Sequence, residues 1–269
     1  MSLRITQVDA FTDKPFAGNP AGVCILPKAA EPAWMLNVAR EMSLAETAFL
    51  VKQRDGYDLR WFTPAVEVDL CGHATLASAH VLWEDGHLKK DDQARFHTKS
   101  GLLTADRRDS WIELDFPATP AAAAPPPEGL SDAIGAKAQF VGRSKFDYLI
   151  ELESEAVVRR LDPDMGAIAR VNARGVIVTS RTDGTNQYDF MSRFFAPQAG
   201  VPEDPVTGSA HCALAPYWSA KLGKKELVAY QASPRGGELR LRLVGDRVKI
   251  SGQAVTVLRG QLTAGNMAS

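Results

Sequence analysis

The feature that most constrains the fold is a repeat that spans half of the 269-residue chain. Gly72 and Gly208 stand 136 positions apart, and the same spacing pairs further small and apolar residues over more than forty positions. The other pairs are Ala74/Ala210, Ala77/Ala213, Ala79/Ala215, Gly101/Gly237, Leu103/Leu239 and Leu114/Ile250. Upstream, the run 60–64 (RWFTP) resembles the run 193–197 (RFFAP). One register over this length favours duplication of a single fold over chance, and predicts two similar domains facing each other.

The boundary between the halves is indicated by an Ala- and Pro-rich stretch from Pro117 to Gly129. Proline lacks an amide proton and breaks helices, so we expect this stretch to form neither helix interior nor sheet ladder. The prediction is a first half over 1–117, a linker over 118–129 and a second half over 130–269. The C-terminal segment is left open as a possible crossover into the first half.

Within each half, β-branched and aromatic runs alternate with few helices. Strands are expected at 5–11, 22–26, 47–51, 57–62, 94–97, 102–107 and 111–116, and in the second half at 175–179, 188–195, 227–230, 239–244, 248–250 and 255–258. Helices are expected from Pro32, over 72–84 and over 208–222. The predicted fold class is α+β, with two pseudo-symmetric domains that each curl an antiparallel, barrel-like sheet around one central helix.

Composition excludes several classes of function. The chain is 45% hydrophobic and 23% charged, with a formal net charge of -1, as in ordinary soluble globular proteins. It has no basic stripe that would favour nucleic acid and no apolar run near the ~20 residues of a membrane span, so a cytoplasmic protein is expected. Cys24, Cys71 and Cys212 lie far apart without Cys-x-x-Cys pairing, which indicates neither a disulfide framework nor a metal site.

Two glycine-led helix starts are the most informative motifs. In the runs 71–75 (CGHAT) and 207–211 (TGSAH), the glycine allows close approach of the backbone, and the following amides lie at the positive end of a helix dipole. Each start is therefore a candidate anion site. If duplication brings both starts to one interdomain cleft, they would hold a carboxylate from two sides.

Four motifs together resemble the PhzF-like (phenazine biosynthesis) isomerase family. They are the runs 16–20 (FAGNP), 42–47 (MSLAET), 71–75 (CGHAT) and 203–210 (EDPVTGSA), and their order covers nearly the whole chain. The resemblance implies the diaminopimelate-epimerase-like fold, a homodimer, and a cofactor-independent isomerase that moves a proton on a small, probably cyclic, acid. It implies catalytic roles for Glu46, His73 and Asp204, and substrate binding by Asn19, Gly72, Ala74, Gly208 and Ser209.

The residues around Glu46 support that role. Glu46 lies between Leu44-Ala45 and the apolar run 48–51, where loss of solvent is expected to raise the pKa of its carboxyl group. The alternative is a solvated glutamate that begins a strand. No glutamate occupies the corresponding region of the second half, 172–175, so the site is expected to be asymmetric.

The other candidates each have a functional and a structural interpretation. A helix N-terminus disfavours the cation of His73, which predicts a neutral imidazole that relays or orients. Asp204 either receives a substrate amine or hydroxyl, or forms a turn before proline. Ser209 either contacts substrate or caps its helix. The remaining histidines, His80, His87, His97 and His211, are interpreted as helix-face or surface residues.

Two rival functions stay open. Related epimerases use paired cysteines at the two helix starts, whereas this chain has Cys71 at the first and Thr207 at the second. A hydroxyl is too weak a base to replace a thiolate, so the first rival is a one-sided, Cys71-based epimerase or dehydratase of a hydroxy- or amino-acid. The second rival is a non-catalytic protein that binds a small molecule.

Overall fold

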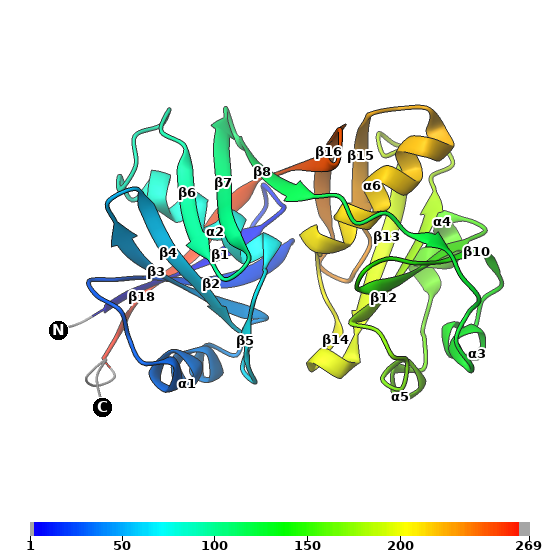
Figure 1. The fold of residues 1–269 in the computed structure, drawn as a ribbon, viewed down its shortest axis with the longest axis horizontal. Helices are drawn as coiled ribbons and strands as arrows, with labels where there is room; N and C mark the ends of the chain where they lie inside the picture. Colours follow the sequence, from blue (N-terminus) through cyan, green and yellow to red (C-terminus); the bar gives the residue numbers. More distant parts are fainter. Residues whose placement is uncertain (1–2, 264–269) are drawn as a thin grey trace. The chain divides into compact units, whose positions relative to one another are not determined.

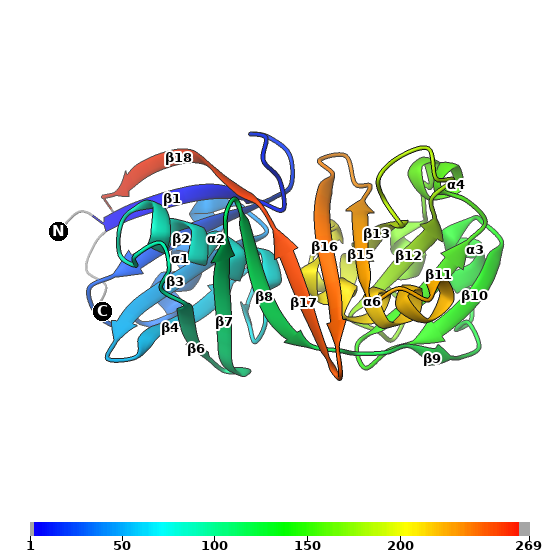
Figure 2. The same cartoon turned by 90° about the horizontal axis from the view of Figure 1, so that it is seen from above.

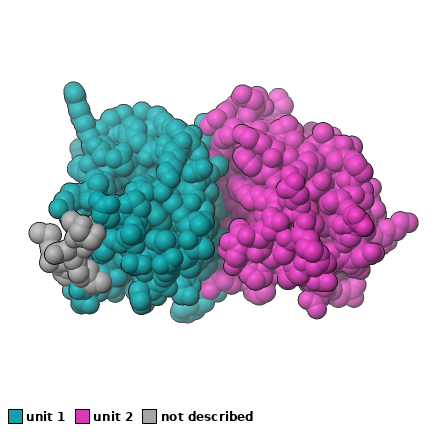
Figure 3. All heavy atoms as spheres, turned by 60° about the horizontal axis from the view of Figure 1, so that its bottom comes forward, with its two compact units in different colours: residues 1–115, 251–269 teal, residues 116–250 magenta. Residues whose placement is uncertain are grey.

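The computed structural model describes residues 3–263, which divide into two compact units (Figure 3). The first comprises Met1–Asp115 with Ser251–Ser269, and the second comprises Phe116–Ile250. The C-terminal stretch joins the first unit because β18 (Ala254–Leu262) pairs antiparallel with β1 (Leu3–Ala10), as Figure 2 shows. The second unit therefore ends well before residue 269, and residues 264–269 of the predicted second half lie outside the described residues.

In the first unit, most of the strands surround one helix, Gly72–Glu84 (Figure 1). After β1, its elements are β2 (Asn19–Leu26), α1 (Pro32–Met42), β3 (Glu46–Gln53), β4 (Gly56–Phe62), β5 (Glu67–Val68), α2 (Gly72–Glu84), β6 (Ala94–Thr98), β7 (Gly101–Arg108) and β8 (Trp111–Pro117). The strand β2 pairs with β1 and β3, β4 pairs with β3, β5 and β6, and β7 pairs with β6 and β8.

The second unit repeats this connectivity. Its elements are β9 (Ala122–Ala123), α3 (Leu130–Ile134), β10 (Ala138–Arg143), β11 (Asp147–Leu152), α4 (Glu155–Arg160), α5 (Met165–Ile168), β12 (Gly175–Arg181), β13 (Phe190–Ala196), a 3-10 turn (Pro197–Ala199), β14 (Val201–Glu203), α6 (Gly208–Leu222), β15 (Glu226–Gln231), β16 (Gly237–Val244) and β17 (Arg247–Gly252). The pairing of β11 to β16 follows that of β2 to β7, strand for strand. The predicted α+β fold with two similar halves is confirmed.

A matched ion pair marks the repeat at the residue level. In the first unit the Arg60 guanidinium forms a fork on the Glu67 carboxylate, with N···O distances of 2.7 and 2.8 Å. In the second, Arg193 forms the same fork on Glu203 at 2.7 and 2.8 Å. The hydrogen bonds from Arg60 lower the pKa of Glu67 to about 2. Both pairs join equivalent strands, β4 to β5 and β13 to β14.

The sheets are mixed, which corrects the prediction of antiparallel sheets. The pairs β2–β3 and β4–β6 are parallel, and so are the equivalent pairs β11–β12 and β13–β15. Parallel neighbours need a crossover connection, and here helices provide it. The crossovers are α1 and α2 in the first unit, and α4, α5 and α6 in the second.

The helices α2 and α6 are buried on nearly all sides, which explains why their sequences have no clear polar face. Eleven residues of α2 are buried, and only His80 and Glu84 of its 13 are not. The helix contacts β1, β2, β3 and β18, while α6 contacts β11, β15 and β16. Within residues 3–263, no helix combines the length and apolar character that a membrane crossing requires.

The Ala- and Pro-rich stretch is not wholly free of sheet structure. Ala122 and Ala123 form the short strand β9, which pairs antiparallel with Gly142 and Arg143 of β10. These alanines precede the run of prolines and keep their amide protons, so a ladder can form there. The stretch also lies within the second unit, because that unit begins at Phe116.

Candidate functional site

Glu46 is the first residue of β3, where a buried parallel strand pair positions it. Its register partner on β2 is Ala21, two residues after Asn19. The residues that follow on β3, from Thr47 to Leu50, are buried, which anchors the strand. The side chain of Glu46 is only 16% exposed, so the interpretation as a fully solvated strand residue is wrong.

His73 brings the first-unit candidates together. Its Nε2 lies 3.1 Å from Oε2 of Glu46, and its Nδ1 lies 3.1 Å from the amide nitrogen of Asn19 and 3.5 Å from Sγ of Cys71. The ring is 5% exposed. The Glu46 and His73 atoms are close enough for an ion pair, although their alignment does not meet hydrogen-bond geometry. Both atoms can therefore also hydrogen-bond a ligand.

The neighbours of His73 favour its cation. Burial disfavours the charged ring, but contacts with Cys71 and Glu46 outweigh it and hold the pKa of His73 well above its ordinary value. This corrects the expectation of a neutral imidazole, because a carboxylate 3.1 Å away has more effect than the helix dipole. A doubly protonated ring donates from Nδ1, and this requires the Asn19 amide to turn its oxygen toward the ring.

Cys71 lies beside this pair as a thiol. Burial and the Glu46 carboxylate raise the pKa of Cys71, although His73 and the Ala74 amide act in the opposite direction. A raised pKa leaves little thiolate at neutral pH, and the thiolate is the reactive form. The first rival function therefore has a poorly activated base. Cys24 and Cys212 are free and buried, and burial raises the pKa of each to about 12.

The start of α2 offers backbone rather than side-chain groups. Gly72 and Ala74 are buried, and the N-cap residue Cys71 makes no side-chain capping bond in the described structure. The first amides of a helix have no partner inside the helix, so they are free to bind an anion or another cap. Ala74 is wholly buried, and its amide lies close enough to Cys71 to affect the pKa of that thiol.

In the second unit, Thr207 is held by two neighbours. Its hydroxyl donates to Oδ2 of Asp204 at 2.5 Å and accepts from the Gln231 amide at 3.1 Å. Gln231 also accepts from the Thr207 amide at 2.8 Å and donates to the Asp204 carbonyl at 2.7 Å. Asp204 and Gln231 together therefore fix the position of the Thr207 hydroxyl. No sequence motif indicated Gln231, which reaches this loop from β15.

Ser209 has a partner that sequence analysis missed. Nη1 of Arg174 lies 3.0 Å from Oγ of Ser209, and the guanidinium forks onto the Asp147 carboxylate at 2.9 and 2.5 Å. Arg174 precedes β12, and Asp147 begins β11. The only sequence signal was the position of Arg174 in the region 172–175, the second-half counterpart of the Glu46 region.

The register of the two units explains the asymmetry. Thr47 pairs with Phe62 in the first unit and Val176 pairs with Phe195 in the second, so Gly175 takes the place of Glu46. A Cβ at Gly175 would lie 2.3 Å from Cζ of Phe194, which leaves no room for a side chain. The second unit therefore cannot carry a second glutamate at this position.

The other histidines differ in their surroundings. His211, expected on a helix face or the surface, is wholly buried in α6, stacks on Phe190, and donates from Nδ1 to the Thr207 carbonyl at 2.8 Å. Burial lowers the pKa of His211 to about 4, so the ring is neutral at pH 7. His87 and His97 are exposed.

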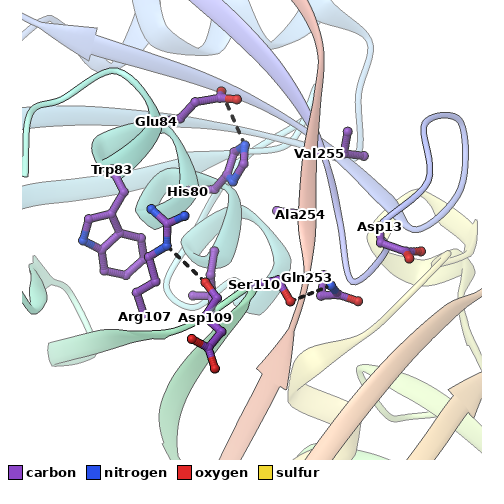
Figure 4. A pocket seen from close by; sticks show the side chains of 11 residues that line it. Asp13, His80, Trp83, Glu84, Arg107, Asp109, Ser110, Gln253, Ala254 and Val255 are labelled. Atoms are coloured by element: carbon purple, nitrogen blue, oxygen red, sulfur yellow. Dashed lines mark hydrogen bonds and ion pairs between the residues drawn. The ribbon is translucent and has the colours of Figure 1, made fainter. Parts of the chain in front are cut away.

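His80 borders a separate cavity in the first unit, of about 310 Å³ (Figure 4). Trp83, Arg107 and Asp109 also line it. His80 is paired with Glu84 at 3.4 Å, and Arg107 is bonded to the Asp109 carbonyl. Burial lowers the pKa of His80. The candidate residues Asn19, Glu46, Cys71 and His73 do not line this cavity.

The ligand atoms of Glu46, Cys71 and His73 lie within 4.8 Å of one another, a spacing that a metal ion could bridge. The two ring nitrogens of His73 face different partners, Glu46 on one side and Asn19 with Cys71 on the other. A ring nitrogen can bind a metal ion only after it has lost its proton.

The fold and the site together define a class of α+β proteins. Its two units have the same order of strand pairing, and a carboxylate, a thiol and an imidazole gather at the start of a buried helix. A hydroxyproline epimerase from Agrobacterium vitis, solved with bound trans-4-hydroxy-L-proline, shares this fold with a TM-score of 0.64 over 97% of this chain and 92% of that one. At 12% identity, that likeness concerns the fold alone.

The chain belongs to the PhzC-PhzF family of phenazine biosynthesis-like proteins, whose model matches residues 8–260. An uncharacterized isomerase of Halalkalibacterium halodurans is 55% identical over 263 residues, which cover 97% of this chain and 99% of the relative. The crystal structure of a PhzF family phenazine biosynthesis protein from Enterococcus faecalis has a TM-score of 0.93 at 40% identity, and covers 98% and 100% of the two chains. The resemblance stated from four motifs is confirmed.

Proposed function

We propose that the protein is an isomerase that shifts a proton on a small, cyclic carboxylic acid, with Glu46 as the general acid and base. The observation that carries the proposal is the contact of 3.1 Å between Oε2 of Glu46 and Nε2 of His73 in a site that is largely closed to solvent. The isomerase names of close relatives support the class of reaction.

The proposed step is a proton transfer in two parts. The Glu46 carboxylate takes a proton from a carbon next to an unsaturated or carbonyl group, and the electron pair left behind spreads into the substrate's π system. The protonated Glu46 then returns the proton at another carbon of that system. Nothing is oxidised or reduced, so the scheme uses no cofactor.

His73 prepares Glu46 for the first part of this step. The His73 ring lies 3.1 Å from Oε2 of Glu46 and is placed to hold that carboxylate in position for proton transfer. Asn19 fixes the ring from the opposite nitrogen. In the first unit the Gly72 amide is proposed to bind the carboxylate of an acid, and in the second unit Asp204, Ser209 and the Gly208 amide are proposed to contact one.

The test is an NMR screen of small cyclic and amino-acid-derived acids in D2O. Wild-type protein is expected to incorporate deuterium at one carbon of a substrate, whereas Glu46→Gln is not. If exchange survives in Glu46→Gln and disappears in Cys71→Ala, the chemistry belongs to the cysteine. If acids bind and none of them exchanges, the protein is a binding protein and not an enzyme.

The state of assembly and the location stay predictions. The family resemblance is the basis for a homodimer, and analytical ultracentrifugation of the purified chain would test it. A cytoplasmic location is likewise a prediction, and fractionation of cells would test it. The proposed partner is a small acid, with neither nucleic acid nor membrane involved.

A further inference from the structure

The Arg174 guanidinium contacts Ser209 at the start of α6 and is held in place by several neighbours. Three of its five N–H groups are engaged, two by Asp147 and one by Ser209. The Asp147 side chain is 2% exposed, and the Ser144 hydroxyl binds both its amide and its carbonyl. The guanidinium also lies 5.1 Å from the Phe146 ring centroid and 5.6 Å from that of Phe194.

This arrangement fixes the direction of the Ser209 hydroxyl. A guanidinium only donates hydrogen bonds, so Oγ of Ser209 must accept from Nη1 of Arg174. Within residues 3–263, the hydroxyl proton is given to no protein acceptor, and it remains available to a ligand. A serine that accepts from a cation becomes a stronger donor through its own proton, because linked hydrogen bonds polarise one another.

The contact between Arg174 and Ser209 lies beside the position of the repeat that corresponds to Glu46 in the first unit. The pair Asp147–Gly175 of β11 and β12 corresponds to the pair Ala21–Glu46 of β2 and β3. The first unit thus has a proton acceptor where its strand begins. At the matching place the second unit has a glycine without room for a side chain, preceded by an arginine anchored on a buried aspartate.

We propose that Arg174, anchored by Asp147, is a positioning residue that makes Ser209 a hydrogen-bond donor to the substrate carboxylate. The inference rests on the proposed function in one respect, the contact of Ser209 with substrate. Because Asp147 neutralises Arg174, the effect comes from the direction of the hydrogen bond more than from net charge. The second unit thereby selects acids over their uncharged analogues.

A double-mutant cycle tests the proposal with benzoate as the probe and benzamide as its uncharged control. NMR titrations would give the dissociation constants for wild type, Arg174→Gln, Ser209→Ala and the double variant. Loss of a donor to a charged group is expected to weaken benzoate binding at least about tenfold in each single variant. Binding by the double variant is expected to be no weaker than by Ser209→Ala, since both changes remove the same contact.

Two further variants separate geometry from charge. Arg174→Lys keeps the charge but cannot form the fork and reach Ser209 at once, so it is expected to behave like Arg174→Gln. Arg181→Gln removes an exposed arginine at the other end of β12 and is expected to bind benzoate as wild type does. Ser209→Thr retains the hydroxyl and is expected to restore most of the binding.

The outcomes separate this inference from the proposed function. Additive losses in the cycle, unchanged binding in Arg174→Gln, or equal affinity of wild type for benzoate and benzamide would each overturn the positioning role. The proposed function is judged instead by the loss of deuterium exchange in Glu46→Gln, a result that the benzoate titrations do not bear on. Thermal unfolding of every variant shows whether a loss of binding is a loss of folding.

Discussion

At the residue scale, the site depends on one buried contact between a carboxylate and an imidazole. The family motifs predicted separate roles for Glu46 and His73, and the structure places the two side chains 3.1 Å apart. The direction of the shift in the pKa of His73 could not be predicted from its helix position alone, because it depends on contacts with Cys71 and with Glu46, and Glu46 comes from β3. The contribution of a tertiary contact to a pKa is visible only once the fold is known.

The raised pKa of His73 predicts a change in its titration on loss of Glu46. NMR of ring nitrogens in histidine-labelled protein is expected to show His73 doubly protonated well above pH 6.5 in wild type. In Glu46→Gln its pKa should fall, because burial is then less opposed. The prediction also concerns stability. Protonated His73 should contribute fully to the free energy of unfolding below pH 6.5, and this contribution should disappear as pH rises through the folded-state pKa of His73. Titration near pH 6.5 in both proteins would contradict it.

Replacement of Phe16 is expected to increase the stability of the protein. Its backbone has a φ of 70°, which bulky residues rarely adopt, and its ring is 81% exposed. Phe16→Asn should raise the free energy of unfolding by about 1 kcal/mol, because asparagine tolerates this conformation and little burial is lost. Phe11 has a φ of 64° but is wholly buried, so Phe11→Asn should destabilise. Urea denaturation would measure both, and a loss of stability in Phe16→Asn would show that the exposed ring has a structural role.

At the element scale, the two buried helices and the strands around them were largely predictable. The predicted ranges 72–84 and 208–222 match α2 and α6 because a glycine start and a run of small residues mark each helix. The strands β10 and β11 and the short helices α3, α4 and α5 were not predicted. Their sequences lack strong alternation, and tertiary contacts supply what local preference does not. The strand β10 pairs with β11, and β11 pairs with β12, while α4 packs on β12 and β13. Parallel pairing was also missed, because it depends on which strands the crossovers bring together.

Gly175 predicts a steric effect at the start of β12. In Gly175→Ala the new Cβ would meet the buried Phe194 ring, so we expect a loss of about 1–3 kcal/mol in unfolding free energy. Gly260 of β18 provides the control, because a Cβ there meets its nearest neighbours at 3.6 and 3.7 Å. Gly260→Ala should be close to neutral in the same denaturation experiment. Equal stability of the two variants would mean that Phe194 moves aside at no cost.

The burial of His211 in α6 is expected to make the stability of the fold sensitive to acid. Its pKa is about 4 in the fold and near 6.5 when unfolded, so the unfolded chain binds the proton more readily. The stability that a neutral His211 confers is complete above pH 6.5 and is lost as pH falls toward 4, by up to about 3 kcal/mol. His211→Gln should show a shallower fall over this window. If both proteins lose stability in parallel as pH falls, His211 does not titrate as a buried neutral ring.

At the scale of the whole molecule, the repeat seen in the sequence is the repeat of the fold. The offset of 136 residues between the glycines matches α2 to α6, and the paired arginine motifs match the forks Arg60–Glu67 and Arg193–Glu203. The repeat could not predict that the last strand returns to the first unit, because β18 has no motif that distinguishes it from its neighbours. Nor could it predict Arg174 and Gln231, whose roles arise from contacts with residues distant in sequence.

The central claim is that Glu46 moves the proton. The most direct test is the rate of deuterium incorporation into one exchanging acid in D2O by wild type, Glu46→Gln and Glu41→Gln. Glu41 is an exposed residue of α1 and serves as the matched control. Loss of a general acid and base should lower the rate by about 10²–10⁴-fold in Glu46→Gln and leave Glu41→Gln unchanged. An unchanged rate in Glu46→Gln would contradict the account.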